Sequence, residues 1–241
     1  MRQKLFFMPL CLLILLIAAC SASSNQPTST LKSGILVTLE VGSSASSTQL
    51  QTVSTMISQR LSAFGLTDAQ VTQTTTNNKP VIQVKVPHFG GKESDTLAQL
   101  LTTGRIEFWL TGPNALENNT TLDPTAYTQY NRGTQAPFSN ADLDPSQYSI
   151  NKDDAGMTGI NFSMNNSSSA RFLAFTKDNV EQYMTITLDR VVILSGVIQS
   201  AIDKKGVIQT SMSEQQARAI VSVLKYSPLP VTLRKLSEET F

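Results

Sequence analysis

The 241-residue chain has few of the side chains that carry enzyme chemistry: one histidine, His88, and two cysteines, Cys11 and Cys20. A Ser-His-Asp triad would have to use His88, and no Gly-x-Ser-x-Gly elbow accompanies it. Zinc sites need several histidine or cysteine ligands. His88 follows Pro87 at the end of an apolar run, which is typical of a surface loop residue. We therefore expect no enzyme, no metal site and no cofactor.

Charged side chains are also scarce, at 15% of the chain, and the formal net charge is only +1. A nucleic-acid-binding domain normally carries a basic patch, so we expect no nucleic-acid partner. Two carboxylate pairs, Asp142 with Asp144 and Asp153 with Asp154, lie close in sequence but lack the ligand spacing of a calcium loop. We interpret them as solvated loop charges.

The chain has one long apolar run, residues 5–19, which follows the basic residues Arg2 and Lys4. Its length is typical of an export signal and short for a membrane span. It ends in Ala18-Ala19-Cys20, which resembles the lipobox of bacterial lipoproteins. We expect residues 1–19 to be a lipoprotein signal peptide, Cys20 to be lipidated and the Ser-rich residues 20–30 to be a flexible tether. The alternative is an uncleaved single-span anchor. Either arrangement places the bulk of the protein outside the cytoplasm, at a membrane.

This interpretation accounts for both cysteines. Cys11 would leave with the signal peptide and Cys20 would carry lipid, so the mature chain would contain no free thiol and no internal disulfide. Loss of Arg2 and Lys4 would leave 17 basic against 18 acidic residues. Electrostatic steering toward an anionic partner is therefore not expected.

Apolar periodicity in the first half predicts alternating strands and helices. We expect a capping box at Thr48-x-x-Gln51 and a helix stop at Gly65. The order β-α-β-β-α-β is the ferredoxin-like pattern. The expected strands cover residues 35–41, 69–73, 81–86 and 106–110, and the helices lie over residues 50–64 and around 97–101.

The second half begins with residues 113–156, which are rich in Asn, Asp, Pro, Tyr and Thr and show little periodicity. We interpret them as a domain boundary and an irregular excursion, with apolar contacts from Phe138 and Leu143. A second small α+β unit is expected over residues 160–202. A strand at 207–212, a capping box at Ser213-x-x-Gln216, a helix stripe over 217–224 and a closing strand at 230–236 follow.

Residues 171–202 are predicted to run helix, strand, tight turn, strand. The expected helical stripe contains Leu173, Thr176, Val180 and Tyr183, widened by Phe172 and Phe175. Met184, Ile186 and Leu188 then alternate with polar residues, which indicates a strand, and Asp189-Arg190 form the turn.

The sequence pattern of this stretch, FxxxTxxNV…LDxxVxLSxxIxxxI, resembles the first periplasmic (P1) domain of the SecD family. SecD is the membrane subunit of the bacterial protein-export machinery. Residues 104–108, GRIEF, and residues 213–233, SEQQARAIVSVLKYSPLPVTL, are similar to family segments in the same order. The likeness covers the chain from about residue 31 onward. It implies an α+β fold in which a ferredoxin-like base, residues 31–112 and 207–241, carries an inserted head, residues 113–206.

The resemblance also implies a function, which is to hold the emerging unfolded chain, as the outer domain of SecD-type proteins does. Family members continue into membrane helices that couple proton flow to motion, but no apolar span follows residues 237–241. We therefore expect no proton-driven motor in this chain. The candidate contacts for polypeptide are Phe172, Phe175, Val192, Ile193 and Ile198, although core packing is the more common role for any one such residue.

Three hypotheses follow. In the first, a membrane-tethered lipoprotein binds exported polypeptide or the Sec translocon and assists secretion. In the second, an envelope scaffolding protein keeps the fold but not the export role. The third, an envelope hydrolase or glycan-binding enzyme, is disfavoured by the missing catalytic set.

Overall fold

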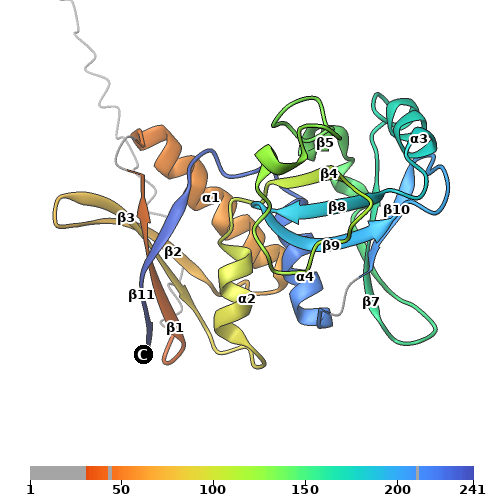
Figure 1. Ribbon diagram of the computed structural model, residues 1–241. Coiled ribbons are helices and arrows are strands. Elements are labelled where there is room, and N and C mark those ends of the chain that lie inside the picture. Colours follow the sequence, from red (N-terminus) through yellow and green to blue (C-terminus); the bar gives the residue numbers. More distant parts are fainter. Residues whose placement is uncertain (1–30, 43–44, 210–211) are drawn as a thin grey trace, which may run out of the picture. The chain divides into compact units, whose positions relative to one another are not determined.

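The computed structural model describes residues 31–42, 45–209 and 212–241 (Figure 1). The predicted signal peptide, the predicted lipidation site Cys20 and the whole tether lie outside these residues. Leu31–Phe241 form one compact unit. None of the helices in the described ranges combines the length and apolar character that crossing a bilayer requires.

A four-stranded antiparallel sheet, here called the base sheet, has the order β11-β1-β3-β2. Its core-facing side alternates as expected, with Ile35, Val37 and Leu39 of β1 opposite Val86, Val84 and Ile82 of β3. Helices α1 (Ser47–Phe64) and α2 (Glu93–Leu100) pack into the same core. This is the ferredoxin-like order, and the α+β class is confirmed. The strands are β1 (Ile35–Val41), β2 (Gln70–Thr76), β3 (Lys79–Val86) and β11 (Leu233–Thr240).

The fourth strand of this ferredoxin-like unit is not the one predicted. We expected residues 106–110 in that place, but β11 pairs with β1 instead. The predicted strand, β4 (Ile106–Gly112), pairs with β5 (Phe138–Ser139) and β8 (Tyr183–Leu188). Every residue of β4 is buried, which suits the interior of a sheet that is covered on both faces.

The second sheet, here called the head sheet, has the order β5-β4-β8-β9, with β9 at Val191–Val197. The predicted turn between β8 and β9 is confirmed: Asp189 and Arg190 both have positive φ, 50° and 71°. Helix α3 (Ser169–Asp178) packs Phe172 and Thr176 into the core. The wider predicted stripe is wrong, because Leu173 and Val180 are 36% and 40% exposed and the helix ends before Val180.

A third sheet joins β10 (Lys205–Gln209), β7 (Thr158–Ser163) and β6 (Ser149–Lys152) in that order. The strand expected at residues 207–212 with the base is described up to Gln209, and that part lies in β10 and pairs with β7 instead. Residues 113–156 are largely irregular, as predicted, and contain three short 3-10 turns. Phe138 and Leu143 provide the expected apolar contacts, since both are buried in the core of the head sheet.

Helix α4 (Glu214–Leu224) serves two cores at once. Ile220 and Leu224 pack in the core beneath the head sheet, while Ala219 and Val223 pack in the core of the base sheet. Its predicted capping box is confirmed, because the Ser213 hydroxyl accepts from the Gln216 amide at 3.3 Å and the Gln216 side chain accepts in return. The corresponding box of α1 lies two residues earlier than predicted, at Ser46-x-x-Gln49.

Candidate functional site

The five residues predicted to contact polypeptide do not form one surface. Phe172, Val192 and Ile198 are 0–2% exposed, and Phe175 and Ile193 are half-buried. Phe172 lies among the rings of the head core, 5.1 Å from Phe138. The binding role of all five stays a prediction, and three of them have almost no accessible surface in this conformation.

Val192 already contacts an extended stretch of polypeptide, which belongs to the same chain. The Val192 amide donates to Thr120 at 2.9 Å, and its carbonyl accepts from the Asn119 amide at 2.8 Å. The Leu122 amide donates to the Arg190 carbonyl at 2.8 Å, and Thr121 forms an isolated antiparallel bridge with Val191. We call residues 116–122 the strap. It runs along β9, an edge strand of the head sheet.

The strap is attached through one small apolar cluster. Leu122 is 3% exposed and packs against Trp109 and Val192, with Leu116 at the margin. The Leu116 amide donates to the Ser195 hydroxyl at 3.0 Å. Residues 117–121 are otherwise exposed. The strap is thus held by backbone bonds and one anchoring side chain.

The sheet face near the strap contains polar atoms that are buried and lack hydrogen-bond partners within the described residues. These atoms are Trp109 Nε1, Thr187 Oγ1 and Arg190 Nη1; Glu107 Oε2 also makes no hydrogen bond, but it is held in an ion pair. Glu107 Oε2 lies 3.2 Å from Arg190 Nε as an ion pair, and the Arg190 guanidinium stands 5.0 Å from the centre of the Trp109 ring. A buried polar group without a partner is costly, so this face could accept further donors and acceptors.

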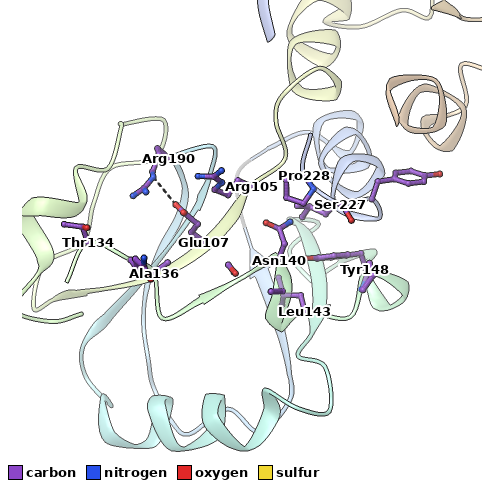
Figure 2. Close-up of a pocket in the computed structure, with 16 residues that line it drawn as sticks. Arg105, Glu107, Thr134, Ala136, Asn140, Leu143, Tyr148, Arg190, Ser227 and Pro228 are labelled. Atoms are coloured by element: carbon purple, nitrogen blue, oxygen red, sulfur yellow. Dashed lines mark ion pairs between the residues drawn. The ribbon is translucent and has the colours of Figure 1, made fainter. Parts of the chain in front are cut away.

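A hollow of about 740 Å³ is lined on one side by the Glu107–Arg190 pair (Figure 2). Figure 2 shows this pair on one side and Asn140, Leu143 and Tyr148 on the other. Burial raises the pKa of Tyr148, so its phenol stays neutral. The hollow therefore offers both charge signs, neutral hydrogen-bonding groups and an apolar wall. Its other walls come from Arg105 and from Tyr226, Ser227 and Pro228 after α4.

Two of the predicted residues border smaller hollows. Phe175 lines one of about 500 Å³ together with Tyr130, Phe138 and Arg171. Ile193 lines another of about 260 Å³. Arg171 stacks on the Phe138 ring at 4.3 Å, so the wall beside Phe175 is aromatic and cationic.

The other sequence candidates have structural roles. His88 is an exposed loop residue, as predicted, and its Nδ1 lies 3.0 Å from Glu93 Oε2. Asp142 is not a solvated loop charge, since its side chain is only 14% exposed and bonds to Arg171, Ser139 and Ser168. No group of three or more His, Cys, Asp or Glu in the described ranges is arranged to hold a metal ion.

Two features of the structure were not predicted from the sequence: the strap and the buried Arg60. Arg60 is 0% exposed although it is charged. Its burial could have been predicted, because Arg60 lies on the apolar face of α1, three residues after Ile57 and four before Phe64. The strap gave no signal, since its residues lack strand periodicity.

Comparison with known proteins finds similarity to SecD and SecDF proteins. Residues 116–231 match the family described as SecDF, P1 head subdomain. The protein translocase subunit SecD of Aquifex aeolicus is 31% identical over 90 residues, which are 37% of this chain and 18% of that protein. SecD of Leptotrichia buccalis is 21% identical over 212 residues, 87% of this chain and 47% of that protein. The chain thus spans less than half the length of these relatives.

Solved structures of SecDF have a similar fold. A crystal structure of SecDF in a super-membrane-facing form superimposes with a TM-score of 0.63 at 21% identity, covering 86% of this chain and 30% of that one. A second chain, from work on SecDF as a membrane component that enhances protein export, gives a TM-score of 0.56 at 21% identity, covering 84% of this chain and 98% of that one. Residues 31–241 therefore have the fold of a SecDF P1 domain.

Proposed function

We propose that this protein acts in protein export outside the cytoplasm, as a P1-type domain that binds exported polypeptide or a component of the Sec translocon. The observation that supports it is the match of residues 116–231 to the P1 head family. That range contains the strap, β9 and most residues around the large hollow. The function is binding and not catalysis.

The proposal includes the predicted division into a base, residues 31–112 and 207–241, and a head, residues 113–206. It also includes a lipid on Cys20, which would hold the domain at a membrane. Residues 20–30 would allow it to reach at most about 35–40 Å from the lipid when fully extended. The protein would act as a passive holder, without a proton-driven motor of its own.

Unfolded polypeptide has groups that complement the surfaces around the strap and the large hollow. It presents apolar side chains and unpaired backbone N–H and C=O groups. The hollow beside Glu107 and Arg190 can accept both backbone groups, and its wall at Leu143 and Pro145 can accept apolar side chains. Binding of this kind needs no particular sequence, which suits a partner of many exported proteins.

Site-specific photocrosslinking in living cells tests the proposal. The probe belongs at Phe175, Val191 or Val197, because the last two are 37% and 42% exposed and Phe175 lines a hollow. Thr74 on the exposed edge strand β2 is the matched control. Crosslinks from the head positions to many secreted precursors, lost when export is blocked, are expected. A single constant partner, indifferent to export, would mean a scaffolding protein and would overturn the export role.

A further inference from the structure

The edge of β9 is built to pair with an extended chain. Within the described residues its one strand neighbour is β8, and its other edge is taken at Val191 and Val192 by the strap. Val192 bonds to two successive strap residues, since its amide donates to the Thr120 carbonyl and its carbonyl accepts from the Asn119 amide. Backbone bonds to both edge groups are what an added peptide strand forms at the edge of an antiparallel sheet.

The strap fills this place incompletely. Leu122 is the one strap side chain that is fully buried, while residues 117–121 face solvent. Beneath it, Trp109 Nε1 and Thr187 Oγ1 have no hydrogen-bond partner within the described residues. Thr187 is paired directly with Val192 across the sheet, and Trp109 packs against Leu122 and Val192, so both residues lie next to the attachment of the strap. A different extended segment could satisfy them, and the strap does not.

We propose that the strap occupies the position on β9 at which exported polypeptide binds. An extended, unfolded segment displaces residues 119–122, pairs its backbone with β9 at Val192, and places an apolar side chain against Trp109 where Leu122 now lies. This inference rests on the proposed function and specifies it: the ligand is an unfolded chain in strand conformation, recognised through its backbone and one apolar side chain. The strap keeps the edge covered when no such chain is present, which also prevents edge-to-edge association.

Thr121 and Val191 allow a direct test. They face each other across the bridge and both are exposed, so cysteines at these positions are well placed to form a disulfide without disturbing the core. The full-length double variant Thr121→Cys/Val191→Cys, in detergent, is titrated with a fluorescent, permanently unfolded protein whose own cysteines are carboxymethylated. We expect oxidation to weaken binding at least about tenfold and reduction to restore it. The variants Thr121→Cys and Val191→Cys, each alone, control for disulfides that involve the native Cys11 or Cys20. Oxidation should not change their binding of the probe.

The outcomes separate the two proposals. Equal binding by the oxidised and reduced forms would overturn the strap inference and leave the proposed function intact. Absence of binding by the wild-type protein and the reduced form alike would overturn the proposed function, and the strap inference with it.

A second variant predicts a change in the opposite direction. Leu122→Ser removes the anchor of the strap, so the unfolded probe should bind several-fold more tightly, because less of the binding energy is used to displace the strap. Hydrogen exchange at residues 119–122 should accelerate when the probe is added. Leu229→Ser, equally buried but in the base core, should give no gain. Weaker or unchanged binding by Leu122→Ser would contradict the inference.

Discussion

Arg60 and Asp189 bind the same short stretch of chain from opposite ends. The Arg60 guanidinium donates to the carbonyls of Thr102 at 2.6 Å and Thr103 at 2.9 Å. The Asp189 carboxylate accepts from the next two amides, Gly104 at 3.2 Å and Arg105 at 2.8 Å. This stretch leads from α2, in the base core, to β4 of the head sheet. The pair therefore fixes the first connection between the two sheets.

Arg60 also reaches the returning connection. It donates to the Ser227 carbonyl at 3.4 Å, and the Leu229 amide donates to Thr103 at 2.8 Å. Burial lowers the pKa of Arg60 to about 10, and the charge of Asp189 opposes this shift. Arg60 is therefore still protonated at neutral pH. A buried charge held mainly by carbonyls is costly, so its value lies in holding both connections in one arrangement.

The first prediction concerns this pair. Arg60→Met should lower the free energy of unfolding by about 3–5 kcal/mol, since it leaves buried carbonyls without their donor. Asp189→Asn should cost about 1–2 kcal/mol, because Asn tolerates the positive φ of the turn but can accept less well. The double variant should lose less than the sum of the two. Urea unfolding measures all three. Strict additivity would show that the residues act independently, and exposed Arg132→Met should change stability by less than about 0.5 kcal/mol.

The second prediction separates packing from binding among the aromatic candidates. Phe172 is fully buried among Phe108, Phe138 and Phe162, so Phe172→Ala should destabilise the fold by about 3–5 kcal/mol. Phe175 makes one ring contact, with Phe138, and borders a hollow, so Phe175→Ala should cost only about 1–2 kcal/mol. Under conditions where both variants are folded, Phe175→Ala should reduce binding of unfolded polypeptide and Phe172→Ala should not. The reverse ranking in binding would make Phe175 a packing residue only.

Local features of the fold could be predicted from the sequence because their determinants are local. The strands β1 and β3, the Asp189-Arg190 turn and the Ser213 capping box depend on residues within a few positions of one another. The ferredoxin-like order could also be predicted, since it follows from the sequence of element types.

The pairing partners of β4 and β10 could not be predicted in this way. An alternating apolar strand such as Ile106, Phe108 and Leu110 fits either sheet equally well, and the choice depends on which edge is free after folding. β11 pairs with the edge of β1, and β4 pairs with β8 in the other sheet. The sharing of α4 between two cores and the strap on β9 were missed for the same reason: both depend on contacts between residues far apart in sequence.

The binding role of the five candidate residues stays a prediction. Val192 and Ile193 lie on β9, where the strap of the same chain is paired at Val192. Apolar pattern alone cannot distinguish a side chain that meets a ligand from one that meets the core. Phe172 and Ile198 have the same chemical character as exposed contacts and are nevertheless buried.

The third prediction is a pH dependence at the start of α2. Glu93 accepts from the Phe89 and Gly90 amides at 2.5 and 2.7 Å and contacts His88. The hydrogen bond from His88 is the largest cause that lowers the pKa of Glu93 below its usual 4.5, followed by the two amides. A lowered folded-state pKa adds stability above the unfolded pKa, and this is lost as pH falls through the folded value.

Glu93→Gln should therefore reduce the free energy of unfolding by about 1 kcal/mol at pH 7, a modest value because the site is partly solvated. The difference from wild type should shrink as pH falls below about 4.5. Unfolding curves at pH 7, 5, 4 and 3 measure it. Asp95→Asn on the same helix, for which no such contacts are present in the described structure, is the control. A difference that stays constant down to pH 3 would show that the carboxylate charge of Glu93 is not what stabilises the loop.

The fourth prediction concerns Cys20, which lies outside the described residues. If its thiol carries the membrane anchor, metabolic labelling with a radioactive fatty acid should mark the wild-type protein and not Cys20→Ala, and that variant should leave the membrane fraction. Cys11→Ala is the matched control and should label normally, because Cys11 lies within the expected signal peptide. Label that persists in Cys20→Ala would overturn the lipoprotein assignment. Loss of label with continued membrane association would favour an uncleaved anchor formed by residues 5–19, since an apolar segment can hold the chain without lipid.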